Sequence, residues 1–106
     1  MYTADPAPDI DRFLQAIADP TRRRILHALK ERGGSSSKKQ SEKKQTGLCA
    51  TDIEERVKLS QPTVSHHMRI LEQASLVESK REGHWRRYQR NEKLITKLMR
   101  GLKERI

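Results

Sequence analysis

The stretch SQPTVSHHMRILEQ, residues 60–73, decides the fold of this chain. It begins with a helix-start signal, because Ser60 can cap the free amides of a first turn and Pro62 stands early, where a missing N–H does no harm. Val64, Met68 and Leu71 then recur at spacings of four and three residues, which gives a helix one apolar stripe. We therefore expect a helix over 60–73 that packs through this stripe.

The opposite side of this helix carries short hydrogen-bonding side chains and one cation. They are Gln61, Thr63, Ser65, His66 and Arg69. An ordinary solvated helix face, which is the alternative, more usually carries pairs of Glu and Lys, and no carboxylate occurs here before Glu72. This face suits the donor and acceptor edges of base pairs and their flanking phosphates. We interpret it as a DNA-reading face and include the neighbouring Ser60 and His67 among the DNA-binding residues.

A second, shorter helix is predicted directly before this one. Leu48 to Asp52 begins it, with Cys49 where a cap is expected and Asp52 three residues on, as in a capping box. It runs to about Val57, and the residues 58–59 make a tight turn into Ser60. Two short helices joined by a tight turn, the second with a polar face, predict a helix-turn-helix.

A basic β-hairpin is predicted after the helix-turn-helix. Residues 76–80 and 85–90 are expected as strands, with 81–84 as a turn in which a glycine can take a positive φ. Such a hairpin is a wing that grips the DNA backbone or minor groove. The expected DNA-binding residues on it are Lys80, Arg81, His84, Arg86 and Arg87. Trp85 and Tyr88 are expected to cover the core rather than stack on bases, although residues three apart in a strand face opposite ways unless a bulge intervenes.

The last helix carries an apolar stripe that is too rich for a peripheral helix of a small domain, and the first helix also has an apolar face. Asp9 is expected to cap the first helix, the segment 19–21 begins a second helix, and Asn91 caps the last. Pairing of the first and last helices across a two-fold axis would bury both apolar faces. The expected dimer-interface residues are Phe13, Leu14, Ile17, Leu94, Ile95, Leu98 and Leu102.

Composition indicates a single domain over residues 1–106 that binds a polyanion. The net charge is +9, with 33% hydrophobic and 35% charged residues, so a lone monomer would be thinly packed. Residues 33–47, rich in Gly, Ser and Lys, are expected to form a flexible insertion that either adds phosphate contacts or is simply solvated. The chain has no apolar run near 18 residues and no signal-peptide pattern, and one cysteine excludes an internal disulfide. We expect a cytoplasmic protein with no membrane partner.

The motifs ADPTRRRILHAL and LCATDIEERVKLSQPTVSHHMRILEQASLVESKREGHWRRY resemble the ArsR/SmtB family of bacterial winged-helix repressors. The resemblance covers about residues 10–95 and is interrupted by the insertion, which is longer than members usually carry. It implies a mainly α fold with a small β-hairpin: four helices, two strands and a final helix. It also implies a homodimeric, cytoplasmic repressor that binds an inverted repeat and leaves when an effector binds.

The best-known effectors of this family are metal ions, but its sensing motifs are incomplete here. Cys49 matches the first cysteine of the family's CxC pair, and Thr51 stands in place of the second. The last helix, RNEKLITKLMRGLKERI, contains neither the Asp nor the His of the other family site. His66 and His67 are adjacent, about 100° apart on a helix, and cannot close on one ion. His27 has no second ligand nearby. We therefore expect no metal and no cofactor, and leave the effector unassigned.

The function predicted from the sequence is sequence-specific binding of double-stranded DNA by a transcriptional regulator, most simply a repressor. An architectural nucleic-acid binder with little sequence preference is the alternative, since the charge would serve either function. A winged helix used for protein contacts is a third possibility. Enzymatic activity has no support, because the chain shows no Gly-rich phosphate loop, paired carboxylates or activated nucleophile.

Overall fold

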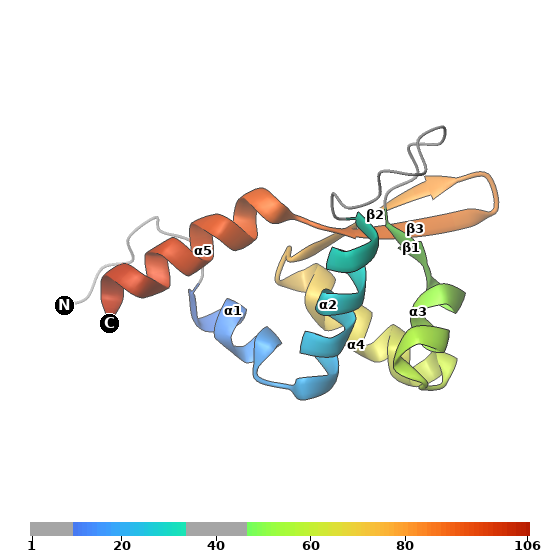
Figure 1. Ribbon diagram of the computed structural model, residues 1–106, viewed down its shortest axis with the longest axis horizontal. Coiled ribbons are helices and arrows are strands. Elements are labelled where there is room, and N and C mark those ends of the chain that lie inside the picture. The colour runs from blue at the N-terminus through green and yellow to red at the C-terminus, as the bar shows by residue number, and fades with distance from the viewer. Residues whose placement is uncertain (1–9, 34–46) are drawn as a thin grey trace.

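The computed structural model describes residues 10–33 and 47–106 and confirms a winged helix-turn-helix (Figure 1). Its elements are α1 (Ile10–Ile17), α2 (Pro20–Gly33), β1 (Leu48–Cys49), α3 (Ala50–Val57), α4 (Gln61–Gln73), β2 (Val77–Glu82), β3 (Trp85–Arg90) and α5 (Glu92–Arg105). The two-residue strand β1 was not expected from the sequence. The predicted cap at Asp9 and residues 34–46 of the predicted insertion lie outside the described residues.

The hydrophobic core lies between α2, α3, α4 and the base of the sheet. The α4 stripe is buried as predicted, with Val64, Met68 and Leu71 at most 2% exposed. Ile25 of α2 and Ile53 of α3 are fully buried against them. Burial of this stripe determines which side of α4 faces outward, so the core determines the orientation of the polar face.

Local backbone contacts shape the helix-turn-helix. At the start of α3 the Cys49 N–H donates to the Asp52 carboxylate at 3.3 Å, as the capping-box pattern predicted. Lys58 ends α3 in the left-handed region, at φ 57° and ψ 48°, and this reverses the chain toward α4. Ser60 occupies the N-cap position of α4, but its hydroxyl donates to the Thr63 hydroxyl at 3.0 Å and not to a backbone group. The expected side-chain cap is therefore replaced by a contact between two hydroxyls.

The three strands form an antiparallel sheet in the order β1-β3-β2. The β2–β3 ladder runs without a break from Val77 opposite Arg90 to Glu82 opposite Trp85. The hairpin turn is thus the two residues 83–84 rather than the predicted four, with Gly83 at φ +65°. With no bulge, Trp85 and Tyr88 face opposite ways: Tyr88 packs on the core, whereas Trp85 is 57% exposed. The expectation that both aromatic residues cover the core is wrong for Trp85.

Gly47 leads into β1 and lies against β3. Its φ is +93°, a conformation that L side chains rarely adopt. A Cβ atom at this position would also collide with the carbonyl oxygen of Tyr88. The close approach of β1 to β3 therefore requires glycine here.

Asn91 connects the sheet, α4 and α5. Its side-chain oxygen accepts a hydrogen bond from the Leu94 N–H at 3.2 Å, which confirms the predicted cap of α5. Its backbone N–H donates to the Leu76 carbonyl at 2.9 Å. Its side-chain amide donates to the Ser75 carbonyl, in the turn after α4, at 3.2 Å. One residue therefore holds the start of α5 to the segment that follows α4.

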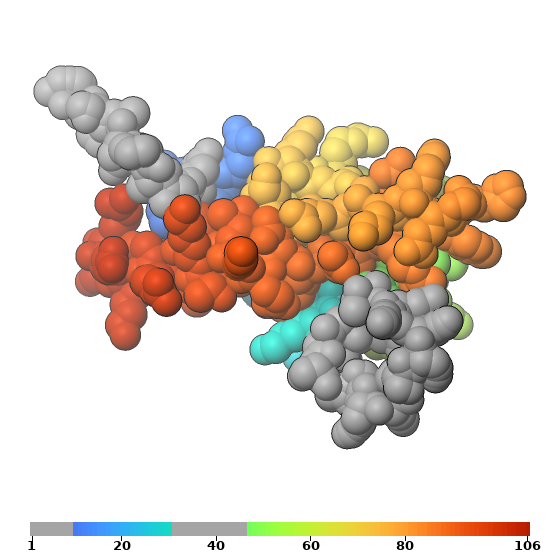
Figure 2. Space-filling view, turned by 90° about the horizontal axis from the view of Figure 1, so that it is seen from above, coloured from blue at the N-terminus to red at the C-terminus, as the bar shows by residue number. Residues whose placement is uncertain are grey.

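Helices α1 and α5 lie at the end of the molecule opposite the hairpin tip (Figures 1 and 2). Of the residues expected at a dimer interface, Phe13 and Leu98 are 3% and 2% exposed within the single chain, so little of their surface remains for a partner. Leu14 is exposed. The others, Ile17, Leu94, Ile95 and Leu102, are partly buried at the edge of the core. No helix among the described residues has the length and apolar character needed to cross a membrane.

Candidate nucleic-acid interface

The outward side of α4 presents the polar face that the sequence predicted. Gln61, His66 and Arg69 are exposed, and Thr63 and Ser65 are partly exposed. The Gln61 side-chain amide donates to the Ser65 hydroxyl at 3.3 Å, so these two side chains of the face are held together. Amide and hydroxyl groups of this kind can both donate to and accept from base edges.

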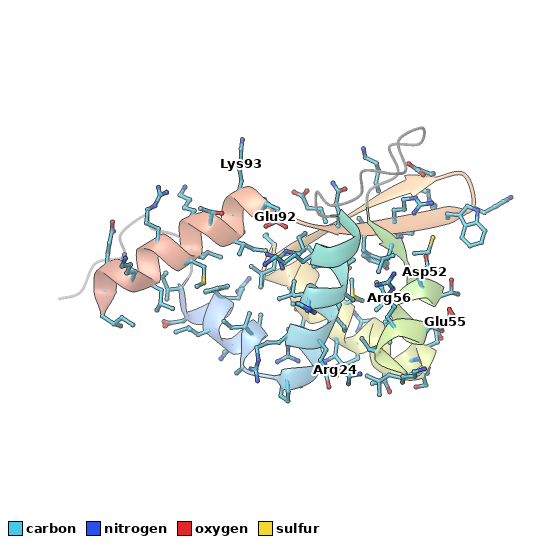
Figure 3. All side chains as sticks on the ribbon, viewed as in Figure 1. Arg24, Asp52, Glu55, Arg56, Glu92 and Lys93 are labelled. Atoms are coloured by element: carbon cyan, nitrogen blue, oxygen red, sulfur yellow. The ribbon has the colours of Figure 1, made fainter. Side chains whose placement is uncertain are left out.

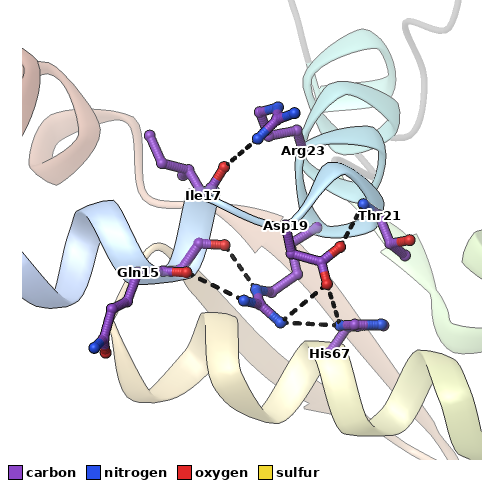
Figure 4. A network of polar contacts seen from close by, with 8 residues as sticks. Gln15, Ile17, Asp19, Thr21, Arg23 and His67 are labelled. Atoms are coloured by element: carbon purple, nitrogen blue, oxygen red, sulfur yellow. Dashed lines mark hydrogen bonds and ion pairs between the residues drawn. The ribbon is translucent and has the colours of Figure 1, made fainter.

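His67 does not belong to this outward face (Figure 4). Its Nδ1 atom lies 3.2 Å from the Arg22 guanidinium and 4.0 Å from the Asp19 carboxylate, and its side chain is 12% exposed. The structure therefore places His67 against α2, whereas the sequence-based prediction included it among the DNA-binding residues. Helix geometry could have shown this, because position 67 is three residues after Val64 and four before Leu71, next to the buried stripe.

Arg22 is the centre of a polar network that joins α1, α2 and α4. Figure 4 shows Gln15, Asp19 and His67 of this network. Its guanidinium donates to the carbonyl oxygens of Ala16 at 2.7 Å and Gln15 at 3.1 Å, at the end of α1. It also lies 3.6 Å from the Asp19 carboxylate. Arg22 stands in the motif ADPTRRRILHAL, but this role depends on the position of α1 and could not be read from the motif.

Local contacts set the charge states in this network. The pKa of Asp19 is lowered, mainly by the 2.7 Å hydrogen bond from the Thr21 N–H and further by the Arg22 charge, so this carboxyl is ionised near neutral pH. The pKa of His67 is lowered, mainly by burial, against the opposing effect of Asp19. A neutral His67 whose Nε2 atom carries the proton can accept a hydrogen bond from Arg22 through Nδ1.

The hairpin carries the second group of predicted DNA contacts. Lys80, Arg81, His84 and Arg86 are exposed, and Figure 2 shows the hairpin side chains projecting beyond the body of the protein. Arg87 differs, because its Nε atom lies 3.3 Å from a Glu82 carboxylate oxygen. Four of the predicted wing contacts are therefore exposed, although Arg86 also donates to the Ser79 hydroxyl at 2.9 Å. The partly buried Arg87 is paired with Glu82.

Two pairs of like charges face each other across the hairpin ladder. Arg81 is directly opposite Arg86, and Lys80 is directly opposite Arg87. Like charges in directly opposed positions destabilise a sheet. This cost would be offset by an anion between them, and DNA phosphates supply such anions.

Cys49 and His27, which the sequence did not indicate as metal ligands, lie on different elements, β1 and α2. Cys49 is a free, partly exposed thiol at the start of α3, and His27 is exposed on α2. Within residues 10–33 and 47–106 no group of three or more His, Cys, Asp or Glu side chains is arranged to hold a metal ion. The chemistry that these residues do assemble is hydrogen bonding and positive charge.

A polar reading helix, a tight turn and a cationic two-stranded wing together define a winged helix-turn-helix DNA-binding protein. Comparisons with known proteins agree with this class. A family model described as a helix-turn-helix domain matches residues 17–80. The chain is 37% identical over 82 residues to the transcriptional repressor SdpR of Bacillus subtilis, covering 77% of this chain and 76% of that protein. It is 31% identical over 94 residues to the arsenical resistance operon repressor of Staphylococcus xylosus, covering 89% and 77%.

Solved structures show the same fold. An ArsR-like transcriptional regulator from Rhodococcus sp. RHA1 superimposes with a TM-score of 0.71 at 23% identity, covering 90% of this chain and 76% of that chain. The homodimeric winged helix-turn-helix DNA-binding domain of a possible ArsR-family regulator from Mycobacterium bovis gives 0.65 at 21% identity, covering 85% and 71%. The chain belongs to the ArsR/SmtB family of winged helix-turn-helix transcriptional regulators. It is a DNA-binding regulator and not an enzyme.

Proposed function

We propose that this protein is a transcriptional repressor that binds an inverted-repeat operator as a homodimer. The observation that carries this proposal is the outward polar face of α4, which the buried stripe holds in one orientation beside a cationic wing. The B. subtilis and S. xylosus relatives are both named as repressors, which supports repression. The M. bovis domain is described as homodimeric, which supports a two-fold assembly.

The two surfaces have different tasks in this proposal. Gln61, Thr63, Ser65 and His66 enter the major groove, where amide and hydroxyl groups discriminate between base pairs. Arg69 contacts guanine or a phosphate. The exposed wing cations hold the backbone or the minor groove, and this contributes affinity with little dependence on sequence.

The dimer interface in this proposal is formed by α1 and α5. Leu14 and Met99 are large apolar residues that remain 40% and 51% exposed on these helices, and a partner would remove them from water. The edges of Ile17, Leu94, Ile95 and Leu102 would extend the contact. Two-fold symmetry would then bring two α4 helices to half-sites about 34 Å apart, one turn of DNA.

The proposal includes no family-type metal effector. Thr51 occupies the position of the second thiolate, and a hydroxyl is a poor ligand for the soft ions that a pair of cysteines binds. The effector of this regulator is therefore expected to use another chemistry or another site.

The division of labour can be tested with Gln61→Ala and Arg86→Ala. An operator is first selected from a random duplex pool, and Kd is then measured against single-base variants at several salt concentrations. We expect Gln61→Ala to cost about 1–3 kcal/mol and to relax specificity at one base position. We expect Arg86→Ala to weaken all duplexes alike and to reduce the slope of log K against log[salt] by about one.

Lys93→Ala is the matched control for loss of a positive charge. Lys93 is exposed at the start of α5 and points away from α4 (Figure 3), so its removal should leave the salt slope unchanged. Equal losses on operator and random duplex for both Gln61→Ala and Arg86→Ala would contradict the proposal. A wild-type specificity ratio near one would instead favour an architectural binder, which the net charge of +9 would also suit.

A further inference from the structure

A groove between α2 and α3 is separate from the DNA-reading surface. It has a volume of about 780 Å³ and is lined by Arg23, Arg24 and His27 of α2 and by Arg56 and Val57 of α3, among others. None of its lining residues belongs to α4 or to the hairpin. Figure 3 shows Arg24 and Arg56 on these two neighbouring helices. The groove therefore collects three guanidinium groups from two elements.

Two of these arginines are held in place by backbone carbonyls. Arg23 donates to the Ile17 carbonyl at 2.6 Å, and Arg24 donates to the Val57 carbonyl at 2.8 Å. A guanidinium has five N–H donors, so these contacts orient the group and leave other donors available. A carbonyl does not neutralise the charge. The groove thus contains oriented cations, which lowers the entropy cost of binding an anion.

Three partly buried arginines in the described part of the chain are paired with carboxylates, whereas Arg23 and Arg24 are exposed. Arg22 lies beside Asp19, Arg87 beside Glu82 and Arg90 beside Glu92. No carboxylate of the described residues forms an ion pair with Arg23 or Arg24. Arg23 and Arg24 can therefore direct their charge toward a ligand in the groove.

Two acidic residues of α3, Asp52 and Glu55, do not line this groove. Asp52 accepts the hydrogen bond from the Cys49 N–H, and Figure 3 shows Glu55 on the side of α3 away from α2. Both line a second, smaller hollow of about 380 Å³, which Arg56 also borders. The lining of the larger groove contains no carboxylate.

We propose that this groove binds a phosphate-type oxyanion through Arg23 and Arg24, with Arg56 and His27 at its edges. Guanidinium groups match the tetrahedral oxygens of phosphate with paired, charge-assisted hydrogen bonds. The oxyanion has two possible sources with the same chemistry. It is either a small phosphorylated molecule that binds the free protein, or a backbone phosphate of DNA that extends beyond the base pairs read by α4.

Inorganic pyrophosphate is the probe for a small-molecule source. Its binding to the full chain without DNA is measured by titration calorimetry in a buffer free of phosphate. Arg23→Gln is the main variant, because Arg23 is exposed and its loss leaves the Arg24–Val57 contact intact. Lys30→Gln is the matched control: it removes one charge from an exposed position on the same helix, outside the groove. We expect Arg23→Gln to weaken binding about tenfold and Lys30→Gln to leave it within about twofold.

The salt dependence of duplex binding tests the DNA source. If a DNA phosphate occupies the groove, Arg23→Gln reduces the slope of log K against log[salt] for duplex binding by about one, and Lys30→Gln leaves that slope unchanged. In that case the two variants bind pyrophosphate equally. Urea unfolding of each variant verifies that stability is unchanged. The proposal is overturned if Arg23→Gln and Lys30→Gln behave alike in both assays, since the groove would then contribute only general charge.

Discussion

The reading helix α4 and the hairpin wing are supported in opposite ways. On α4 the buried stripe at positions 64, 68 and 71 packs against α2 and α3, and His67 adds a polar anchor beside it. The wing is held by its backbone ladder, and beyond Ser79 its β2 side chains are exposed. Side-chain packing therefore orients α4, whereas backbone hydrogen bonds orient the tip of the wing.

This difference suits the two tasks. Discrimination between bases needs donors and acceptors at fixed positions, which a helix packed on a core provides. Contact with phosphate needs charge within reach and tolerates less exact placement, which exposed lysine and arginine side chains provide. Substitutions in the support of α4 should consequently cost more stability than substitutions at the wing tip.

The largest expected effect comes from Leu71→Ala. Leu71 is fully buried, and removal of its side chain leaves a cavity, so we expect the free energy of unfolding to fall by about 2–5 kcal/mol. Trp85→Ala removes a larger side chain that is 57% exposed, and we expect a change within about 0.5 kcal/mol. Urea unfolding measures both. Similar losses of unfolding free energy in the two variants would contradict the proposal that side-chain packing stabilises α4 but not the tip of the wing.

Gly47→Ala examines the base of the wing, where β1 joins β3. The variant introduces a Cβ at φ +93° that collides with the Tyr88 carbonyl, so we expect a loss of more than about 2 kcal/mol. Gly83→Ala is the matched control at the tip. Its φ is +65°, but nothing lies within 4 Å of the added Cβ, so strain alone should cost about 1–2 kcal/mol. If the control costs as much as Gly47→Ala, the β1 contact does not constrain the wing.

His67→Asn examines the polar anchor of α4 and has the smallest expected effect. Burial lowers the pKa of His67 in the folded protein, so the unfolded chain binds the proton more tightly. Its contribution to stability is therefore complete above the ordinary pKa of 6.5 and is lost as the pH falls through that value and the folded pKa. Asn keeps an acceptor near the Nδ1 position and does not titrate. Between about pH 8 and about pH 5 the free energy of unfolding of His67→Asn should therefore change less with pH than that of the wild-type protein. The two slopes should differ by under about 1.4 kcal/mol per pH unit.

His66→Asn is the control for this pH experiment, because His66 is the exposed neighbour of His67. Asp19, Arg22 and His66 are the charged or titratable groups that act on the His67 ring, and Asp19 titrates at a much lower pH. A pH profile altered equally by His66→Asn and His67→Asn would show that general charge, and not the contact with Arg22, is responsible.

Local patterns were sufficient to predict the helix-turn-helix and its orientation. The spacing of Val64, Met68 and Leu71 determines which face of α4 is buried, and Asn91 caps α5 as its residue type indicated. These features depend on residues within one or two turns of helix. The sequence carries them because helical periodicity and capping are local properties.

Features that depend on distant partners were not predicted correctly. β1 has only two residues, too few to show an alternating pattern, and it exists because it pairs with Tyr88 and Arg87 of β3. Trp85 and Tyr88 were both placed on the core, but the unbroken register puts only Tyr88 there. Arg22 reaches α1 and α4 only in the folded chain, so no local pattern could reveal its network.

The position of Asn91 has a mechanical consequence for the proposed dimer. Its side-chain amide and backbone N–H donate to the Ser75 and Leu76 carbonyls while its side-chain oxygen caps α5, so the start of α5 is tied to the residues that directly follow α4. Asn91 is thus the residue through which α5 contacts the segment that follows α4. In the proposed dimer, a ligand that rotated the two α5 helices would therefore change the orientation of both α4 polar faces without contacting α4.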